Sequence, residues 1–110
     1  MMHLSQKHCV ACEGGVPPLT SEQVAGYRVQ VPEWDIAADE KSISREFVFE
    51  NFKEALAFVN SVGEIAEAEG HHPDINLHAY KKVRISLSTH AIGGLSENDF
   101  IVAAKIDARN

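Results

Sequence analysis

The chain has 110 residues, a length that favours a single domain with one hydrophobic core. Its share of hydrophobic residues, 45%, is ordinary for a folded protein, and its net charge of −6 argues against nucleic-acid binding as the main role. No apolar run reaches the ~20 residues that cross a bilayer, and the N-terminus lacks the apolar stretch of a secretory signal. We therefore expect a cytoplasmic protein with no membrane partner and with reduced cysteines.

The N-terminal sequence predicts a loosely ordered extension of 18 residues before a folded domain over 19–110. The extension contains Cys9 and Cys12, with His3 and His8 nearby. Three states are open for this group: a zinc site, a switchable disulfide, or free reduced thiols in a solvated tail. Zinc is the weaker alternative, because a complete site usually shows a second clear pair of ligands.

The sequence of the first part of the domain predicts a short helix and then two strands. In "LTSEQV", Thr20 has the position of a helix cap and Gln23 the reciprocal position three residues later. Gly26 is predicted to end this helix. The segments "EWDIAAD" (33–39) and "SISREFVFE" (42–50) then predict two strands.

The longest predicted helix covers 51–70, with Asn51 as its cap. Gly70 suits the left-handed position beyond a helix end, and Pro73 prevents continuation. Gly63 interrupts the helix and suggests that another element packs closely there. Apolar residues recur at helical spacing and predict a buried stripe: Phe52, Ala55, Leu56, Val59, Val62 and Ala66.

After the proline, 74–80 and 81–90 alternate apolar and polar residues and predict a hairpin. The sequence "LSENDFIVAAKI" then predicts a last helix, with Ser96 as cap and Asp99 as its reciprocal partner. The order is α-β-β-α-β-β-α. Because one strand face is apolar and the other polar, we expect an α+β fold: a four-stranded antiparallel sheet with three helices on one face.

Three histidines and an aspartate fall at element ends in this arrangement. His71 and His72 follow the long helix, His90 ends the last strand, and Asp99 lies in the first turn of the last helix. Imidazole gives and takes protons near neutral pH, and a nearby carboxylate can fix its orientation or charge. The four residues together predict a polar pocket suited to acid–base chemistry.

Each residue also has a simpler interpretation. Asp99 can serve only as a helix cap, His71 and His72 can be solvated turn residues, and His90 can be an ordinary strand end. A divalent metal held by the three histidines and Asp99 is disfavoured, because adjacent histidines suit tetrahedral geometry poorly. The functional case therefore depends on the four residues acting together.

The segments around these residues resemble a known family. "EAEGHHP", then an aromatic residue, then "THAIGGLSENDF" are similar to the pterin-4a-carbinolamine dehydratases. The resemblance covers roughly residues 19–106, together with the lead-in "GGVPPLT", and its spacings fit throughout. The matching positions are Glu67, His71, His72, Pro73, Tyr80, Thr89, His90 and Asp99.

The resemblance implies a dehydratase, a carbon–oxygen lyase that converts a 4a-hydroxytetrahydropterin to quinonoid dihydropterin during tetrahydrobiopterin recycling. It implies no cofactor and no metal. By this match His71 and His90 are the acid–base pair, in either order, and Asp99 positions or charges a histidine. His72 is a binding residue with a share in proton transfer.

Further implications concern binding and assembly. Glu67, His72, Pro73 and Thr89 are implied as residues that bind the pterin. Dimers or tetramers are implied, with a pterin-dependent aromatic amino acid hydroxylase as a metabolic neighbour. Some relatives also act as dimerisation cofactors of a transcription factor. The alternative is therefore a non-catalytic module that binds pterin or a protein partner.

Overall fold

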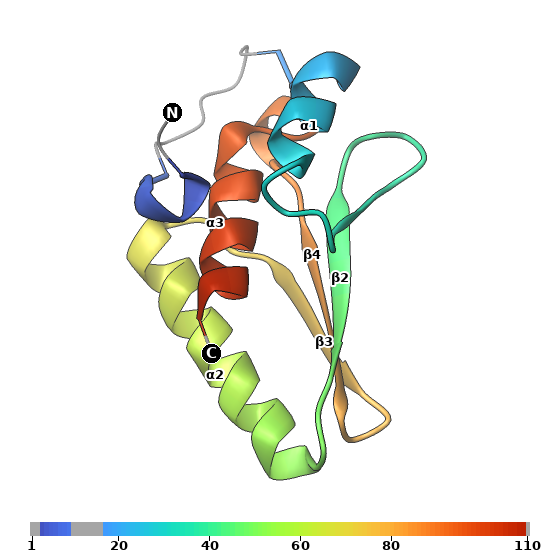
Figure 1. Cartoon of the computed structure of the whole chain (residues 1–110), viewed down its shortest axis with the longest axis vertical. Coiled ribbons are helices and arrows are strands. Elements are labelled where there is room, and N and C mark those ends of the chain that lie inside the picture. The colour runs from blue at the N-terminus through green and yellow to red at the C-terminus, as the bar shows by residue number, and fades with distance from the viewer. Residues whose placement is uncertain (1–2, 10–16, 110) are drawn as a thin grey trace.

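The computed structural model describes residues 3–9 and 17–109. Over these residues the chain forms three α-helices and one four-stranded antiparallel sheet, which confirms the predicted α+β fold (Figure 1). No helix in these two ranges combines the length and the apolar character needed to cross a membrane. In chain order the elements are η1 (Leu4–Gln6), α1 (Ser21–Arg28), β1 (Asp35–Ile36), β2 (Ile43–Val48), α2 (Phe52–Glu69), β3 (Asp74–His78), β4 (Lys82–Leu87), η2 (His90–Ile92) and α3 (Glu97–Ala108).

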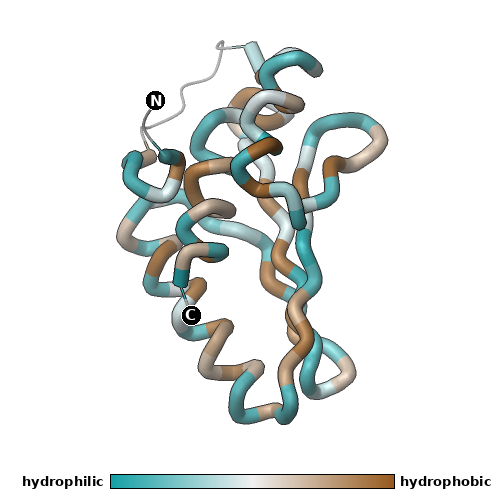
Figure 2. Tube along the Cα trace, in the orientation of Figure 1, coloured by the Kyte–Doolittle hydropathy of each residue, from teal (hydrophilic) through white to brown (hydrophobic). Residues whose placement is uncertain are grey.

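The sheet has the strand order β1-β2-β4-β3, so the hairpin strand β4 lies at its centre beside β2. Alternation along β4 determines the buried face, with Val83, Ile85 and Leu87 buried and Arg84 exposed. Figure 2 shows the same alternation of hydrophobic and hydrophilic residues along the strands. The apolar side faces the helices, as in a sheet covered on one face.

Helix α3 occupies the centre of the core. Six of its apolar residues are at most 4% exposed: Phe100, Ile101, Val102, Ala103, Ala104 and Ile106. A helix buried around most of its circumference needs partners on several sides. Figure 1 shows them: the sheet, α2, α1 and the N-terminal turn η1 surround it.

Two predicted boundaries were wrong. The first predicted strand, 33–39, is reduced to the two residues of β1, because the buried Trp34 is anchored to Asp107 through its indole N–H at 3.0 Å and the chain turns at Glu40, where φ is 57°. Helix α1 continues two residues past Gly26. Stacking of Tyr27 on Phe100, with ring centroids 5.4 Å apart, explains this extra half-turn.

The ends of α2 are as predicted. Asn51 accepts a hydrogen bond from the backbone N–H of Glu54, and Gly70 closes the helix with φ of 64°. The predicted apolar stripe is buried only in part, since Phe52 is 49% and Leu56 42% exposed. The prediction of close packing at Gly63 was wrong, because no heavy atom outside its own helix backbone lies within 4 Å of a Cβ placed there.

Residues 3–9 lie against the helices. Leu4 is 1% exposed, which for a leucine contributes about 2 kcal/mol of burial free energy. Its backbone N–H donates to Gln30 at 2.8 Å, and Lys105 donates to the Ser5 carbonyl at 3.1 Å. The division into an extension and a domain over 19–110 stays a prediction, as do the alternatives for the cysteine pair, because Cys12 lies outside the described residues.

The last residue of α2, Glu69, is the anchor for this segment. Its side chain is 6% exposed and accepts the Cys9 backbone N–H at 2.8 Å, with His8 at 3.3 Å and Lys105 at 3.5 Å. Burial opposes the charged form of Glu69, but these donors outweigh it and lower the pKa of the carboxyl.

We expect opposite effects from two glycine substitutions. Gly63→Ala should stabilise the fold by about 1 kcal/mol, because a helix-interior glycine is replaced without a clash. Gly94→Ala should destabilise it, because the added Cβ would lie 2.7 Å from the Pro18 Cβ. Urea unfolding of both variants measures the two changes, and equal stabilities would contradict the packing described.

A pH-dependent contribution is expected from Glu69. Its lowered pKa means that its stabilisation is complete above about pH 4.3, the ordinary glutamate pKa, and is lost as the pH falls through the folded-state value. Wild type should exceed Glu69→Gln by about 1–2 kcal/mol in unfolding free energy at pH 7 and by much less at pH 3. Glu64→Gln, on the exposed side of α2, is the control and should show no such pH dependence.

Candidate functional site

The buried carboxylate of Asp99 is the centre of the site. It is 0% exposed and lies in the first turn of α3. Its Oδ2 atom accepts two hydrogen bonds, from the Thr89 hydroxyl and from the Ser96 backbone N–H, both at 2.9 Å. Its Oδ1 atom is 2.6 Å from Nε2 of His71. The predicted cap is thus present, and the same carboxylate also holds a histidine.

Strand pairing explains why residues so distant in sequence meet here. Asp74 at the start of β3 pairs with Ser86 of β4 in an antiparallel register. Moving backwards from Asp74 and forwards from Ser86 brings His71 towards Thr89 at the same end of the sheet. The α3 N-terminus follows a short loop after Thr89, and this loop is closed by backbone bonding between Thr89 and Gly94 at 2.9 Å.

The backbone at the end of α2 sets the position of His71. Gly70 adopts the left-handed conformation, and the N–H of His71 donates to the Ala66 carbonyl at 3.2 Å. The His71 side chain is 13% exposed, so it is largely withdrawn from water. A carboxylate only accepts hydrogen bonds, so Nε2 of His71 carries the hydrogen and Nδ1 is left for proton exchange in the neutral ring.

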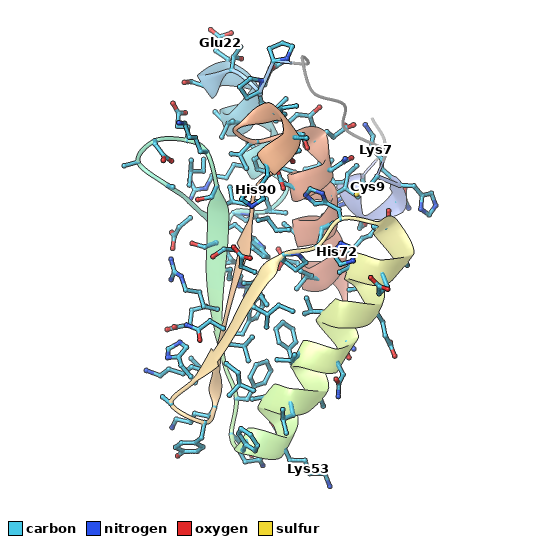
Figure 3. The ribbon with its side chains drawn as sticks, turned by 180° about the vertical axis from the view of Figure 1, so that it is seen from behind. Lys7, Cys9, Glu22, Lys53, His72 and His90 are labelled. Atoms are coloured by element: carbon cyan, nitrogen blue, oxygen red, sulfur yellow. The ribbon has the colours of Figure 1, made fainter. Side chains whose placement is uncertain are left out.

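His72 points to a different partner. Its Nε2 atom is 2.5 Å from Oε2 of Glu67, one turn earlier on α2, and the two side chains are 62% and 78% exposed. Figure 3 shows His72 where α2 passes into β3. The two adjacent histidines therefore contact different acids: His71 contacts the buried Asp99, and His72 contacts the solvated Glu67.

His90 lies in a separate hollow at the end of β4. This hollow has a volume of about 340 Å³ and is lined by Lys41, Ser42, Ser88, Thr89, His90, Gly93 and Gly94. The residue His90 is exposed, and Figure 3 shows it at the tip of its strand. Thr89 belongs to both parts of the site, because its hydroxyl bonds Asp99 while the residue lines the His90 hollow.

The predicted residues are therefore brought together in three groups, not in one contact network. His71 joins Asp99 and Thr89, His72 joins Glu67, and His90 lines the adjacent hollow. Pro73 is half-buried between His72 and β3. Over 3–9 and 17–109, no cluster of three or more histidine, cysteine or acidic side chains is placed to hold a metal ion.

Three residues contribute to the site although the sequence did not assign them to it: Ser96, which was predicted only as a helix cap, and Lys41 and Ser42. The Ser96 hydroxyl is 2.8 Å from the Thr89 hydroxyl and completes the polar chain around Asp99. Lys41 and Ser42, from the loop before β2, line the hollow beside His90. Strand order alone places this loop next to the end of β4, since β2 pairs with β4 and Ile43 lies opposite Leu87; no local motif indicates it.

Thr89→Val tests the support of Asp99. The substitution preserves shape but removes the hydroxyl donor to a fully buried carboxylate, which should cost about 1–3 kcal/mol of unfolding free energy. Ser88→Ala, at the neighbouring position in the same hollow, is the matched control and should change stability by less than about 0.5 kcal/mol. Urea unfolding compares them, and similar values for both variants would contradict this role of Thr89.

The chain is similar to known proteins in both sequence and structure. The family model described as pterin 4 alpha carbinolamine dehydratase matches residues 17–109. A protein of Halorhodospira halophila is 56% identical over 108 residues, covering 97% of each chain. A protein of Methylococcus capsulatus is 50% identical over 104 residues, covering 94% of this chain and 90% of its own. Both carry the provisional name pterin-4-alpha-carbinolamine dehydratase.

Two solved structures share the fold. A Brucella melitensis protein described as a transcriptional coactivator/pterin dehydratase aligns with a TM-score of 0.77 and 30% identity, covering 83% of this chain and 96% of its own. A pterin dehydratase-like protein described as a RuBisCO assembly factor in the alpha-carboxysome aligns with a TM-score of 0.58 and 25% identity. The alignment covers 69% of this chain and 87% of that protein. From its sequence, its fold and its relatives, the chain belongs to the pterin 4 alpha carbinolamine dehydratase family.

Proposed function

We propose that the protein catalyses the dehydration of a 4a-hydroxytetrahydropterin to the quinonoid dihydropterin. Membership of the dehydratase family supports the reaction class. The observation that supports acid–base catalysis most directly is the 2.6 Å contact between His71 and the fully buried Asp99. A histidine oriented in this way is a typical proton carrier near neutral pH.

The reaction requires two proton transfers and no net oxidation. The lone pair of N5 forms the C4a=N5 bond as the C4a–O bond breaks, and the leaving hydroxide takes a proton to become water. The hydrogen on N5 is then removed to give the neutral quinonoid product. One group must donate a proton and one must accept a proton, and imidazoles perform both tasks at neutral pH.

We assign these tasks to His71 and His90, in either order. Asp99 holds the ring of His71 and balances its positive charge when it is protonated. His90 belongs to an exposed hollow of about 340 Å³, which is room for part of a bicyclic pterin. Thr89 joins the two parts, which supports a substrate lying across them.

The remaining predicted residues are assigned to binding. His72 and Glu67 form an exposed pair at the rim of the site, suited to hydrogen bonding with the polar edge of a pterin. Pro73 restricts the backbone of His72, which precedes it. We place the activity in cytoplasmic tetrahydrobiopterin recycling, in service of an aromatic amino acid hydroxylase and in a dimer or tetramer.

Turnover of the wild type, His71→Ala and His90→Ala tests the assignment. Each variant should lose about 10²–10⁴-fold in kcat, the usual contribution of a general acid or base. His78→Ala is the matched control, because His78 pairs with Glu46 on the open face of the sheet, away from the site. Dehydration of the 4a-hydroxy compound is followed by absorbance.

Wild-type kinetics in both histidine variants would refute the catalytic assignment. Absence of turnover in wild type, with a dihydropterin still bound in a calorimetric titration, would favour the non-catalytic pterin-binding module. Absence of both would favour a role as a protein-dimerisation module, which would need none of the three histidines.

A further inference from the structure

Cys9 touches both of the helix ends that present the His71–Asp99 pair. Its backbone N–H donates to Oε1 of Glu69 at 2.8 Å, and Glu69 is two residues before His71. Its thiol donates to the backbone carbonyl of Asn98 at 3.7 Å, and Asn98 immediately precedes Asp99. One residue of the N-terminal segment therefore links the end of α2 to the start of α3.

Lys7 adds a second link on the α3 side. Its ammonium lies 2.6 Å from the carboxylate of Glu97, in the first turn of α3, and Tyr27 donates to the same carboxylate at 3.2 Å. Figure 3 shows Lys7 and Cys9 beside the end of α2 and the start of α3. Two residues of the segment thus hold the turn that carries Asp99.

The Glu69 carboxylate is the polar contact that holds this segment to the end of α2. A carboxylate at a helix C-terminus is opposed by the helix dipole, and here it is also 94% withdrawn from water, its side chain being 6% exposed. The Cys9 N–H, His8 and Lys105 offset both penalties. The lowered pKa of Glu69 means that these donors more than compensate for burial, so the N-terminal segment and the end of α2 stabilise each other through this carboxylate.

The position of Glu69 in the chain couples it to His71. Only Gly70 separates Glu69 from His71, so any movement of the end of α2 is passed on to the His71 ring. Asp99 is fixed on α3, and the two side chains must stay within 2.6 Å to act together. Displacements near 1 Å in a catalytic group reduce rates by up to about 10²-fold.

We propose that Cys9 and Glu69 form a clamp that positions His71 against Asp99 for the reaction. Both are positioning residues, since neither lines the hollow beside His90. The proposal rests on the dehydratase function proposed above. It also makes residues 3–9 part of the functional unit, although they precede the segment matched by the family model.

Kinetics of Glu69→Ala provide the first test. We expect kcat to fall about tenfold with KM within twofold of wild type, because the pair is misaligned while the hollow is unchanged. Glu69→Gln should recover most of the activity, since its amide oxygen still accepts the Cys9 N–H. Glu64→Ala, an exposed glutamate of the same helix, is the matched control and should behave as wild type.

The reactivity of Cys9 provides a readout of the clamp that does not depend on turnover. Burial, with the negative charges of Glu69 and Asp99, raises the pKa of the Cys9 thiol to about 12, so it should react slowly with iodoacetamide at pH 8. In a Cys12→Ser background, Glu69→Ala should increase the alkylation rate at least tenfold. Glu64→Ala should leave this rate unchanged.

Proton NMR detects the hydrogen bond between His71 and Asp99 directly. The hydrogen between His71 and Asp99 lies in a 2.6 Å bond and should resonate far downfield. That signal should weaken or disappear in Glu69→Ala and persist in Glu64→Ala. Should Glu69→Ala fail to fold, Glu69→Asp, which shortens the side chain by one methylene, serves for all three measurements.

Wild-type kcat in a Glu69 variant whose Cys9 is rapidly alkylated would overturn the positioning role. Unchanged alkylation together with an unchanged downfield signal would overturn the clamp. If the wild type has no dehydratase activity, the proposed function fails separately, and the clamp is decided by the NMR signal: its loss in Glu69→Ala supports the clamp and its persistence refutes it.

Discussion

Complete burial of one carboxylate constrains the part of the fold that contains the candidate site. Asp99 is removed from water, and an ionised group in that position needs hydrogen-bond donors on all sides. Those donors come from three places in the chain: the end of β4, the first residues before α3, and the turn after α2. Satisfying Asp99 therefore fixes the relative positions of two helix ends and a strand end, which is also the requirement for an acid–base site.

The antiparallel hairpin makes this convergence possible. Because β3 and β4 pair from Asp74 opposite Ser86 onwards, the residue that leaves α2 and the residue that leaves β4 lie at one end of the sheet. A slip of one residue would turn Thr89 away from Asp99 and would move the apolar residues of β4 out of the core. The core of the sheet and the alignment of the site thus depend on the same register.

The N-terminal segment, residues 3–9, is likewise held in place by buried contacts. Helices α2 and α3 diverge towards the C-terminal end of α2, which lies beside η1 (Figure 1). Leu4 provides the apolar contact, and Glu69 the polar anchor. A short segment that would have little structure alone is therefore held by a buried side chain at one end and a buried charge at the other.

The sequence alone determined the order of elements and the ends of the long helix, and it singled out three histidines and an acid as candidate site residues. These are local properties: a cap at Asn51, a left-handed glycine at Gly70, and the alternation along β4. The predicted length was too long for strand β1 and too short for helix α1, because Trp34 and Tyr27 contact distant partners in α3.

Only the tertiary structure decided how the predicted site divides. The sequence placed His71, His72 and His90 near one another, but did not indicate that one would meet a buried acid, one an exposed acid, and one an open hollow. It also gave no sign that Glu69 would receive the N-terminal segment. Such contacts join residues far apart along the chain, and their geometry depends on how helices and sheet pack, which no local pattern encodes.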